Sequence, residues 1–155
     1  MATLHLMVGL PCSGKTTLAQ KLERDLAALR LNLDEWHIRL FGQDAEAPEH
    51  DARHSVIETN LWTIARRVLE LGTDVILDYG LWAREERDAY RSRAKQLGAS
   101  SEIHFLDVPD EELLRRLEIR NSQPSQDSFF IPKEAMKPWI AIFQAPTHDE
   151  LERRE

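Results

Sequence analysis

The chain reads MVGLPCSGKTT from Met7 to Thr17, and this stretch fits the phosphate-binding loop pattern GxxxxGK[ST], the Walker A motif. An apolar run, Leu4 to Val8, leads directly into it. Leu18, Leu22 and Leu26 follow at helical spacing. Strand, loop and helix therefore come in the order that a nucleoside triphosphate site requires, and the sequence predicts that the protein binds ATP.

Each part of this motif has a chemical role. Its two glycines allow the backbone to curl so that successive N–H groups point at the phosphates, and the following helix adds its positive N-terminal end. Lys15 brings a positive charge, and Thr16 offers a hydroxyl to Mg²⁺. We therefore expect the nucleotide to be bound by Gly9, Pro11, Cys12, Ser13, Gly14, Lys15, Thr16 and Thr17.

The composition predicts one domain, residues 1–155. The chain has 42% hydrophobic and 30% charged residues, which suits a single packed core, and no apolar run approaches the roughly 20 residues of a membrane span. A single cysteine, Cys12, suits a reducing compartment, and the apolar N-terminal run ends in the phosphate loop, so we expect a cytoplasmic protein without a signal peptide. The net charge of −7 disfavours nucleic-acid partners.

Strands and helices are predicted to alternate along the chain. After the first helix, the apolar pattern predicts strands at 29–33, 75–77 and 103–108, and helices at 57–71, 90–97 and 110–120. This order is typical of a three-layer α/β/α fold with a central, mostly parallel sheet of four to five strands. Ligands bind at the carboxyl ends of such strands, where Gly9, Asp34 and Asp78 all fall.

Other segments are less regular. Residues 42–49 and 121–128 lack periodicity and predict surface loops or mobile flaps, and 132–139 predicts a short helix. The charged residues 149–155 predict a solvated end.

Two aspartates are candidates for the chemistry. Asp34 follows the second predicted strand and could accept the proton of an attacking hydroxyl, or could simply cap the next helix. Asp78 ends the apolar run 75–77, as the carboxylate of a Walker B element does, and could hold Mg²⁺ together with Thr16. It could instead bind substrate or hydrogen-bond a turn.

Arginines complete the candidate site. Arg116 and Arg120 lie one helical turn apart before an irregular stretch, which is typical of a lid, about residues 115–130, that places guanidinium groups over the transferring phosphate. The alternative is a solvated helix in which Glu112 pairs with Arg116. Arg39 and the pair Arg84 and Arg87 are candidates for substrate binding.

Taken together, these residues resemble a family. The phosphate loop, Leu33-Asp34-Glu35-Trp36, Val75 to Asp78 and Arg116 to Asn121 are similar to segments of small P-loop kinases related to the 5′-hydroxyl polynucleotide kinases, a group that includes zeta toxins and chloramphenicol phosphotransferase. The resemblance covers about residues 3–146. It implies that Asp34 is the general base and that Arg116 and Arg120 grip the nucleotide phosphates.

The chain also departs from that family. Polynucleotide kinases have an arginine three residues after the base, whereas here His37 stands there and Arg39 comes five residues on. The family's final apolar strand is not visible after residue 146, so a four-stranded sheet or a partner that completes it stays possible.

Two further features have alternative interpretations. His50 and His54 share a helix face, but with no third ligand at diagnostic spacing the sequence does not predict a metal site there. Trp36 and Trp82 could stack on a substrate ring or belong to the core.

The sequence thus predicts an ATP-dependent kinase that uses Mg²⁺. Lys15, Arg116 and Arg120 would stabilise the transferring phosphate, Asp34 would be the base, and Asp34, Arg39, Asp78 and Arg84 would bind the acceptor. The expected acceptor is a hydroxyl of a small molecule. The alternatives are a kinase of nucleic-acid 5′ ends and a regulatory ATP-binding protein read by a partner. The sequence does not decide the oligomeric state.

Overall fold

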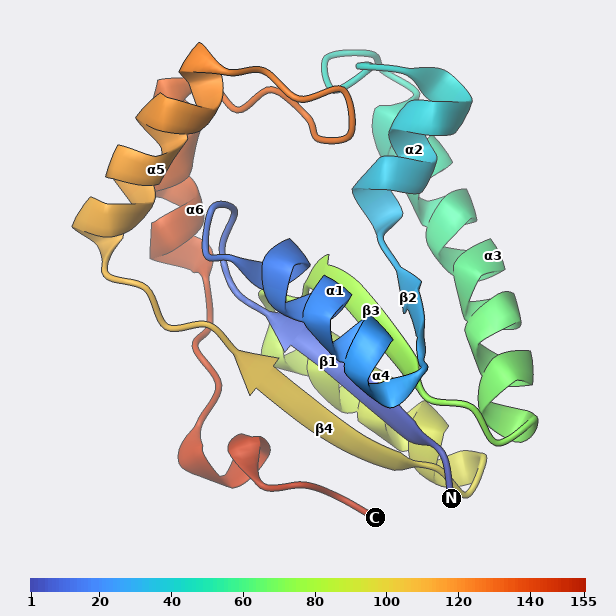
Figure 1. Ribbon diagram of the computed structural model, residues 1–155. Helices are drawn as coiled ribbons and strands as arrows, with labels where there is room; N and C mark the ends of the chain where they lie inside the picture. The colour runs from blue at the N-terminus through green and yellow to red at the C-terminus, as the bar shows by residue number, and fades with distance from the viewer.

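A parallel sheet of four strands lies at the centre of the computed structural model, which describes residues 1–155 (Figure 1). The strands are β1 (Thr3–Val8), β2 (Leu29–Leu31), β3 (Val75–Gly80) and β4 (Ser100–Phe105), in the order β2-β3-β1-β4. Every neighbouring pair is parallel, with Leu4 opposite Val75 and Ser101. The central strand β1 is buried along its whole length, as expected for a strand covered on both faces.

Helices cover both faces of this sheet and extend beyond its carboxyl edge. They are α1 (Lys15–Leu26), α2 (Leu33–Phe41), α3 (His50–Glu70), α4 (Arg84–Gln96), α5 (Asp110–Ser122) and α6 (Met136–Ile142), with short 3-10 turns η1 (Lys133–Ala135) and η2 (His148–Leu151). In Figure 1, α1 lies in front of the sheet and α4 behind it, while α5 and α6 stand beyond the ends of the strands. None of these helices is long and apolar enough to cross a membrane.

The alternation of side chains along the strands divides the core into two layers. Leu4, Leu6 and Val8 point to one face, where they pack with the apolar sides of α3 and α4. Met7 and Ile76 point to the other face and pack against Ala19 of α1. The protein therefore has the three-layer α/β/α architecture that the sequence predicts.

A third cluster joins α5 and the segment that follows it to the phosphate loop. Leu117 of α5 packs with Ile131 and Met136, and Cys12 lies against this group. The loop that follows α5 returns across the top of the molecule toward the α2–α3 connection (Figure 1). There Gln43 donates a hydrogen bond to the carbonyl of Ser128 and accepts one from the N–H of Phe130.

Most predicted elements are present, with shifted ends. The second strand ends at Leu31, so Asp34 lies in the first turn of α2 and not at a strand end. The helix predicted at 57–71 begins earlier, at His50. The sheet has four strands, the lower of the two numbers predicted.

The C-terminal end is exposed at Asp149 and at residues 151–155, as predicted for a solvated end, and differs from that prediction at Glu150. Glu150 is fully buried and pairs with the equally buried Arg87, with 3.2 Å between Oε1 and Nε. Arg154 then exchanges backbone hydrogen bonds with Ser101 of β4 in an antiparallel bridge. The charged composition of residues 149–155 did not reveal the burial of Glu150. This carboxylate can enter the interior because the buried Arg87 of α4 neutralises it.

Candidate active site

The phosphate loop connects β1 to α1 and depends on backbone geometry that few residues tolerate. Gly14 has a φ of 94° and Cys12 has a φ of 70°, both in the left-handed region. A Cβ atom on Gly9 would lie 2.6 Å from Oγ of Ser13, so a side chain there would force the buried Ser13 side chain to move. These positions explain the spacing of the motif.

Lys15 is held at the centre of this loop. Its ammonium donates a hydrogen bond of 2.8 Å to the carbonyl of Leu10. Burial lowers the pKa of Lys15, while the negative charges of Asp78 and Asp34 act to raise it. The lysine and both aspartates singled out from the sequence therefore lie in one site.

Asp78 at the end of β3 is only 3% exposed, and its two carboxylate oxygens have different surroundings. Oδ2 accepts four hydrogen bonds, from Thr16 Oγ1, Nε and Nη2 of Arg30, and Nδ2 of Asn32. Oδ1 is buried and has no hydrogen-bond partner. A buried, unpaired carboxylate oxygen next to a threonine hydroxyl fits the oxygen ligands that Mg²⁺ prefers.

Arg30 and Asn32 are the site residues that the sequence did not reveal. The Arg30 side chain is 10% exposed and bridges Asp78 and Glu35, with Nη2 2.9 Å and 2.8 Å from their oxygens. An arginine between two leucines of a short strand does not by itself indicate a functional site. Only the pairing of β2 with β3 places it beside Asp78.

Asp34 extends from the first turn of α2 into the cavity described below, and its side chain is 55% exposed. It does not cap the helix, because the cap is Asn32, whose Oδ1 accepts the N–H of Glu35 at 2.9 Å. Nε2 of His54 lies 3.9 Å from Oδ1 of Asp34. Burial lowers the pKa of His54, although the negative charge of Asp34 opposes this.

Both lid arginines reach the phosphate loop. Nη1 of Arg116 donates to the carbonyl of Cys12 at 3.0 Å, and its Nε donates to Glu112 at 3.0 Å. Nη1 of Arg120 lies 4.0 Å from the Cys12 sulfur, and its Nη2 donates to the carbonyl of Phe129 at 2.7 Å. The sequence left two alternatives for Arg116, an ion pair with Glu112 or a position over the phosphate loop. In the structure Arg116 makes both contacts.

A cavity of about 920 Å³ lies between the phosphate loop, α2, α3 and the lid. Its walls include Lys15, Thr16, Asp34, Asp78, Arg116 and Arg120. Its size is at the upper end of the roughly 300–1,000 Å³ typical of ligand sites. Trp82 and Trp139 form part of the wall with their ring centroids 5.5 Å apart, whereas Trp36 is not among the lining residues.

The arginines predicted to bind substrate lie elsewhere. Arg87 is buried against Glu150 and is absent from the cavity wall. Arg39 is exposed on α2 and is absent from the cavity wall. Arg84 begins α4 and binds the C-terminal segment through Thr147 and Asp149. None of these predictions as a cavity residue fits the structure, because Arg39 lies on the outer face of its helix, Arg84 points to the tail and Arg87 is buried.

The fold is found among solved structures of P-loop kinases and their relatives. A chain of the Pnkp1/Rnl/Hen1 RNA repair complex is 25% identical, with a TM-score of 0.75, over 91% of this chain and 43% of its own length. Kti12 from Chaetomium thermophilum, solved with ADP-AlF3, is 22% identical, with a TM-score of 0.69, over 93% and 81% of the two chains. A gluconokinase from Sinorhizobium meliloti is 18% identical, with a TM-score of 0.63, over 97% and 78%.

The chain thus spans less than half the length of the RNA repair protein chain, and the two less similar structures establish the fold alone. No curated protein sequence matches closely enough to count as a relative. A family model described as an AAA domain matches residues 4–146. This range begins in β1 and ends just after α6. With its phosphate loop, parallel sheet and P-loop kinase architecture, this chain belongs to that AAA domain family.

Proposed function

We propose that this protein is an ATP-dependent kinase that transfers the γ-phosphate to a hydroxyl group of a small molecule. The observation that carries the proposal is the division of one cavity into two chemically different sides. Lys15, Arg116 and Arg120 surround the phosphate loop, whereas Asp34 stands on the wall formed by α2 and α3. Positive charge on one side and a carboxylate on the other match the needs of phosphoryl transfer to an alcohol.

The reaction follows from these positions. Asp34 accepts the proton of the acceptor hydroxyl while that oxygen bonds to the γ-phosphorus, and the bond from phosphorus to the ADP oxygen breaks. Lys15 and the two lid arginines stabilise the charge on the phosphoryl oxygens. The lid excludes water, which limits hydrolysis of ATP.

Thr16 and Asp78 are the residues that would hold Mg²⁺. The unpaired Oδ1 of Asp78 supports this assignment, and Arg30 and Asn32 fix the carboxylate by binding its other oxygen. When bound, the ion neutralises phosphate charge. Asp78 is thereby assigned to the metal and not to the acceptor.

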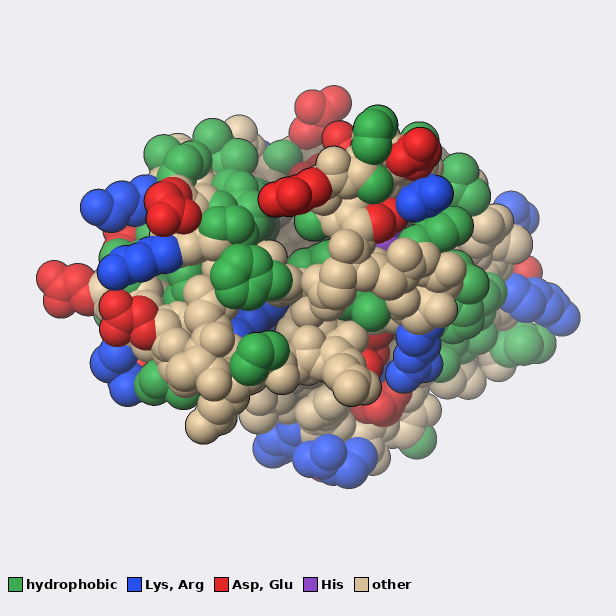
Figure 2. Space-filling model, turned by 90° about the horizontal axis from the view of Figure 1, so that it is seen from above, with side chains coloured by type: hydrophobic (Ala, Val, Ile, Leu, Met, Phe, Trp, Pro, Cys, Tyr) green, Lys and Arg blue, Asp and Glu red, His purple; other side chains and the backbone are tan.

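The charge of the acceptor wall supports a small molecule that carries little negative charge. Among the residues that line the cavity, the only lysine and arginines are Lys15, Arg116 and Arg120, all on the phosphate side. Viewed from above in Figure 2, the lysine and arginine side chains lie in separate groups and form no continuous basic band. A polynucleotide would need such a band to bind its phosphates. Two proteins that share this fold are a gluconokinase and a sugar kinase.

A nucleic-acid 5′-hydroxyl kinase is the second candidate. It is favoured by the similarity to a chain of an RNA repair complex, which is 25% identical with a TM-score of 0.75. The acidic net charge of −7 and the neutral to acidic acceptor wall argue against it.

The test is transfer of labelled phosphate. The protein would be incubated with γ-labelled ATP, Mg²⁺ and either a metabolite extract or 5′-hydroxyl oligonucleotides, using wild type, Asp34→Asn and Asp51→Asn. Asp51 is an exposed carboxylate in the first turn of α3 outside the cavity, so Asp51→Asn is the matched control. We expect label in a small molecule with wild type and the control, and a loss of about 10²- to 10⁴-fold with Asp34→Asn at unchanged ATP affinity.

Each other outcome has a defined meaning. Label on the oligonucleotides would favour the second candidate. Undiminished transfer by Asp34→Asn would refute the base assignment, and release of free phosphate alone would indicate an ATPase.

A further inference from the structure

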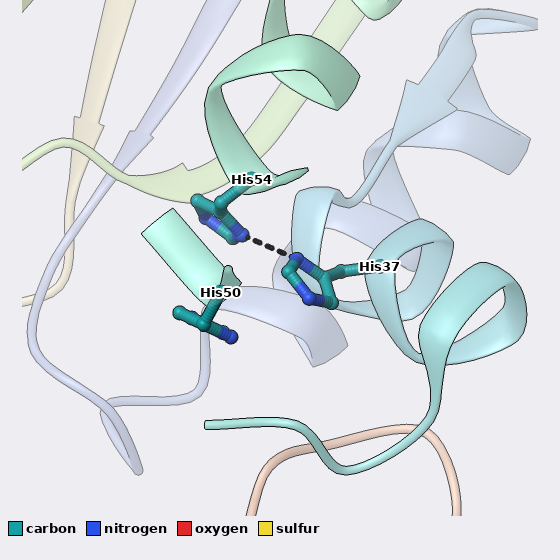
Figure 3. A group of neighbouring side chains, drawn as sticks. All are labelled: His37, His50 and His54. Carbon is teal, nitrogen blue, oxygen red and sulfur yellow. Dashed lines mark hydrogen bonds between the residues drawn. The ribbon is translucent and has the colours of Figure 1, made fainter. Parts of the chain in front are cut away.

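Three histidines meet where α2 packs against the start of α3. Figure 3 shows His37 extending from α2 toward His50 and His54 on α3. One ring nitrogen from each lies within 4.8 Å of the others. The ring centroids are 4.4 Å apart for His37 and His50, 5.1 Å for His37 and His54, and 5.5 Å for His50 and His54.

A carboxylate orients two of these rings. Oδ1 of Asp44 accepts hydrogen bonds from Nε2 of His37 at 2.6 Å and from Nδ1 of His50 at 2.7 Å, while Arg53 binds its other oxygen at 3.0 Å. A neutral imidazole carries one proton, and the carboxylate of Asp44 fixes it on Nε2 of His37 and on Nδ1 of His50. The other ring nitrogen, Nδ1 of His37 and Nε2 of His50, then has a free lone pair. A carboxylate behind a histidine is the usual support of a metal-binding imidazole.

His54 adds the third nitrogen. Its Nδ1 lies 3.0 Å from Nδ1 of His37, the contact drawn in Figure 3. Two imidazole nitrogens bound to one tetrahedral zinc ion lie about 3.4 Å apart, so an ion could replace the shared proton with a movement of only a few tenths of an ångström. Spacing along the sequence could not reveal this set, because the third ligand comes from a different helix.

We propose that His37, His50 and His54 form a binding site for one divalent transition-metal ion, with zinc as the expected ion. Three histidine nitrogens suit zinc in preference to the oxygen-seeking Mg²⁺. His50 and His54 line the cavity, so an ion can reach these two ligands from there. The site itself does not depend on the proposed kinase activity.

A second group, His5, Glu102 and His104, is the natural comparison within the same chain. It has two imidazoles instead of three, and none of its members lines the cavity. His5 resembles His37 in its contacts, with one ring nitrogen 2.9 Å from His104 and the other 3.0 Å from Asp74, but the third member of its group is a carboxylate and not an imidazole. This group therefore provides a control and not a second proposal.

The test measures metal binding without nucleotide or acceptor. Protein freed of metal by a chelator would be titrated with Zn²⁺ in competition with a chromophoric indicator, and with Co²⁺ while its visible absorption is recorded. We expect one ion per chain with the intense absorption of tetrahedral Co²⁺. His50→Gln and His54→Gln should each weaken binding by about 100-fold or more, whereas His104→Gln and the exposed His148→Gln should leave it unchanged.

Wild type alone can refute the proposal, if it binds neither ion or binds Co²⁺ without tetrahedral absorption. Unchanged binding in both His50→Gln and His54→Gln, or its loss in His104→Gln, would also overturn it. Unfolding curves of the metal-free variants separate loss of the site from loss of the fold. Because phosphate transfer is not measured, the result is independent of the kinase assay.

Discussion

Asp78 uses its two carboxylate oxygens for different purposes. Oδ2 is saturated by Thr16, Arg30 and Asn32, while Oδ1 stays unpaired inside the site. A buried carboxylate is tolerated only with a compensating charge, and Arg30 provides it. Arg30 is therefore a positioning residue whose effect on the reaction passes through Asp78.

This role predicts the effect of replacing Arg30. Arg30→Leu leaves the charge of Asp78 buried without its partner, so we expect a loss of about 3–5 kcal/mol in the free energy of unfolding. Arg24→Leu, at an exposed position on α1, is the control and should change it by no more than about 0.5 kcal/mol. Denaturant titration measures both. Equal effects of the two substitutions would show that the Arg30–Asp78 pair contributes nothing to stability.

At the scale of elements, the end of β3 and the phosphate loop depend on each other. The N–H of Gly9 donates to the carbonyl of Gly80 at 3.0 Å. Gly80 has a φ of 100°, and a Cβ atom there would lie 3.2 Å from the carbonyl oxygen of Gly9 and 3.6 Å from Cε of Lys15. A side chain at Gly80 would therefore press on the backbone of the loop at Gly9, while its contact with Lys15 would be an ordinary van der Waals contact.

We predict that Gly80→Ala weakens ATP binding. Overpacking strain of about 1–3 kcal/mol at the loop corresponds to roughly a 5- to 150-fold loss of affinity. Gly72→Ala is a matched control, because Gly72 also has a positive φ, 87°, but nothing lies within 4 Å of the added atom. Both variants should lose stability, and only Gly80→Ala should lose affinity for a fluorescent ATP analogue. Equal affinities of the two variants would contradict the coupling.

At the scale of the whole molecule, the C-terminal segment connects α4 to the edge of the sheet. Glu150 binds Arg87, and Arg91 donates to the backbone carbonyls of Glu150 and Glu152. Ser101 and Arg154 then bridge the segment to β4. One buried carboxylate thus holds both α4 and the tail in place.

This arrangement predicts that acid loosens the tail. Burial acts to raise the pKa of Glu150, but hydrogen bonds from Arg87 and from the backbone of Thr147 outweigh it, so the pKa lies below the ordinary 4.5. A lowered carboxyl pKa gives stability that is present above 4.5 and is lost as the pH falls through the lowered value. Arg84 also faces this group. We expect the amide of Arg154 to lose protection below pH 4.5, as measured by hydrogen exchange corrected for intrinsic rates.

Two comparisons check the assignment. The amide of Leu6, at the centre of β1, should keep its protection over the same range. Glu150→Gln, which cannot lose a charge, should remove the pH dependence at Arg154. If the dependence persists in that variant, Glu150 is not its source.

The amino-acid sequence by itself determined the phosphate loop, the alternation of strands and helices and the edge at which Asp34 and Asp78 gather. These features depend on local patterns, namely glycine spacing, the period of apolar residues and the rule that parallel strands end at one edge. Only the tertiary structure decided that Arg30 lies beside Asp78, that Arg39 and Arg84 point away from the cavity, that Glu150 is buried, and that His37 joins His50 and His54. Each of these facts depends on which elements become neighbours in space. β2 packs on β3, α2 on α3 and the tail on β4 because the whole core is buried together, and no short stretch of residues specifies these contacts.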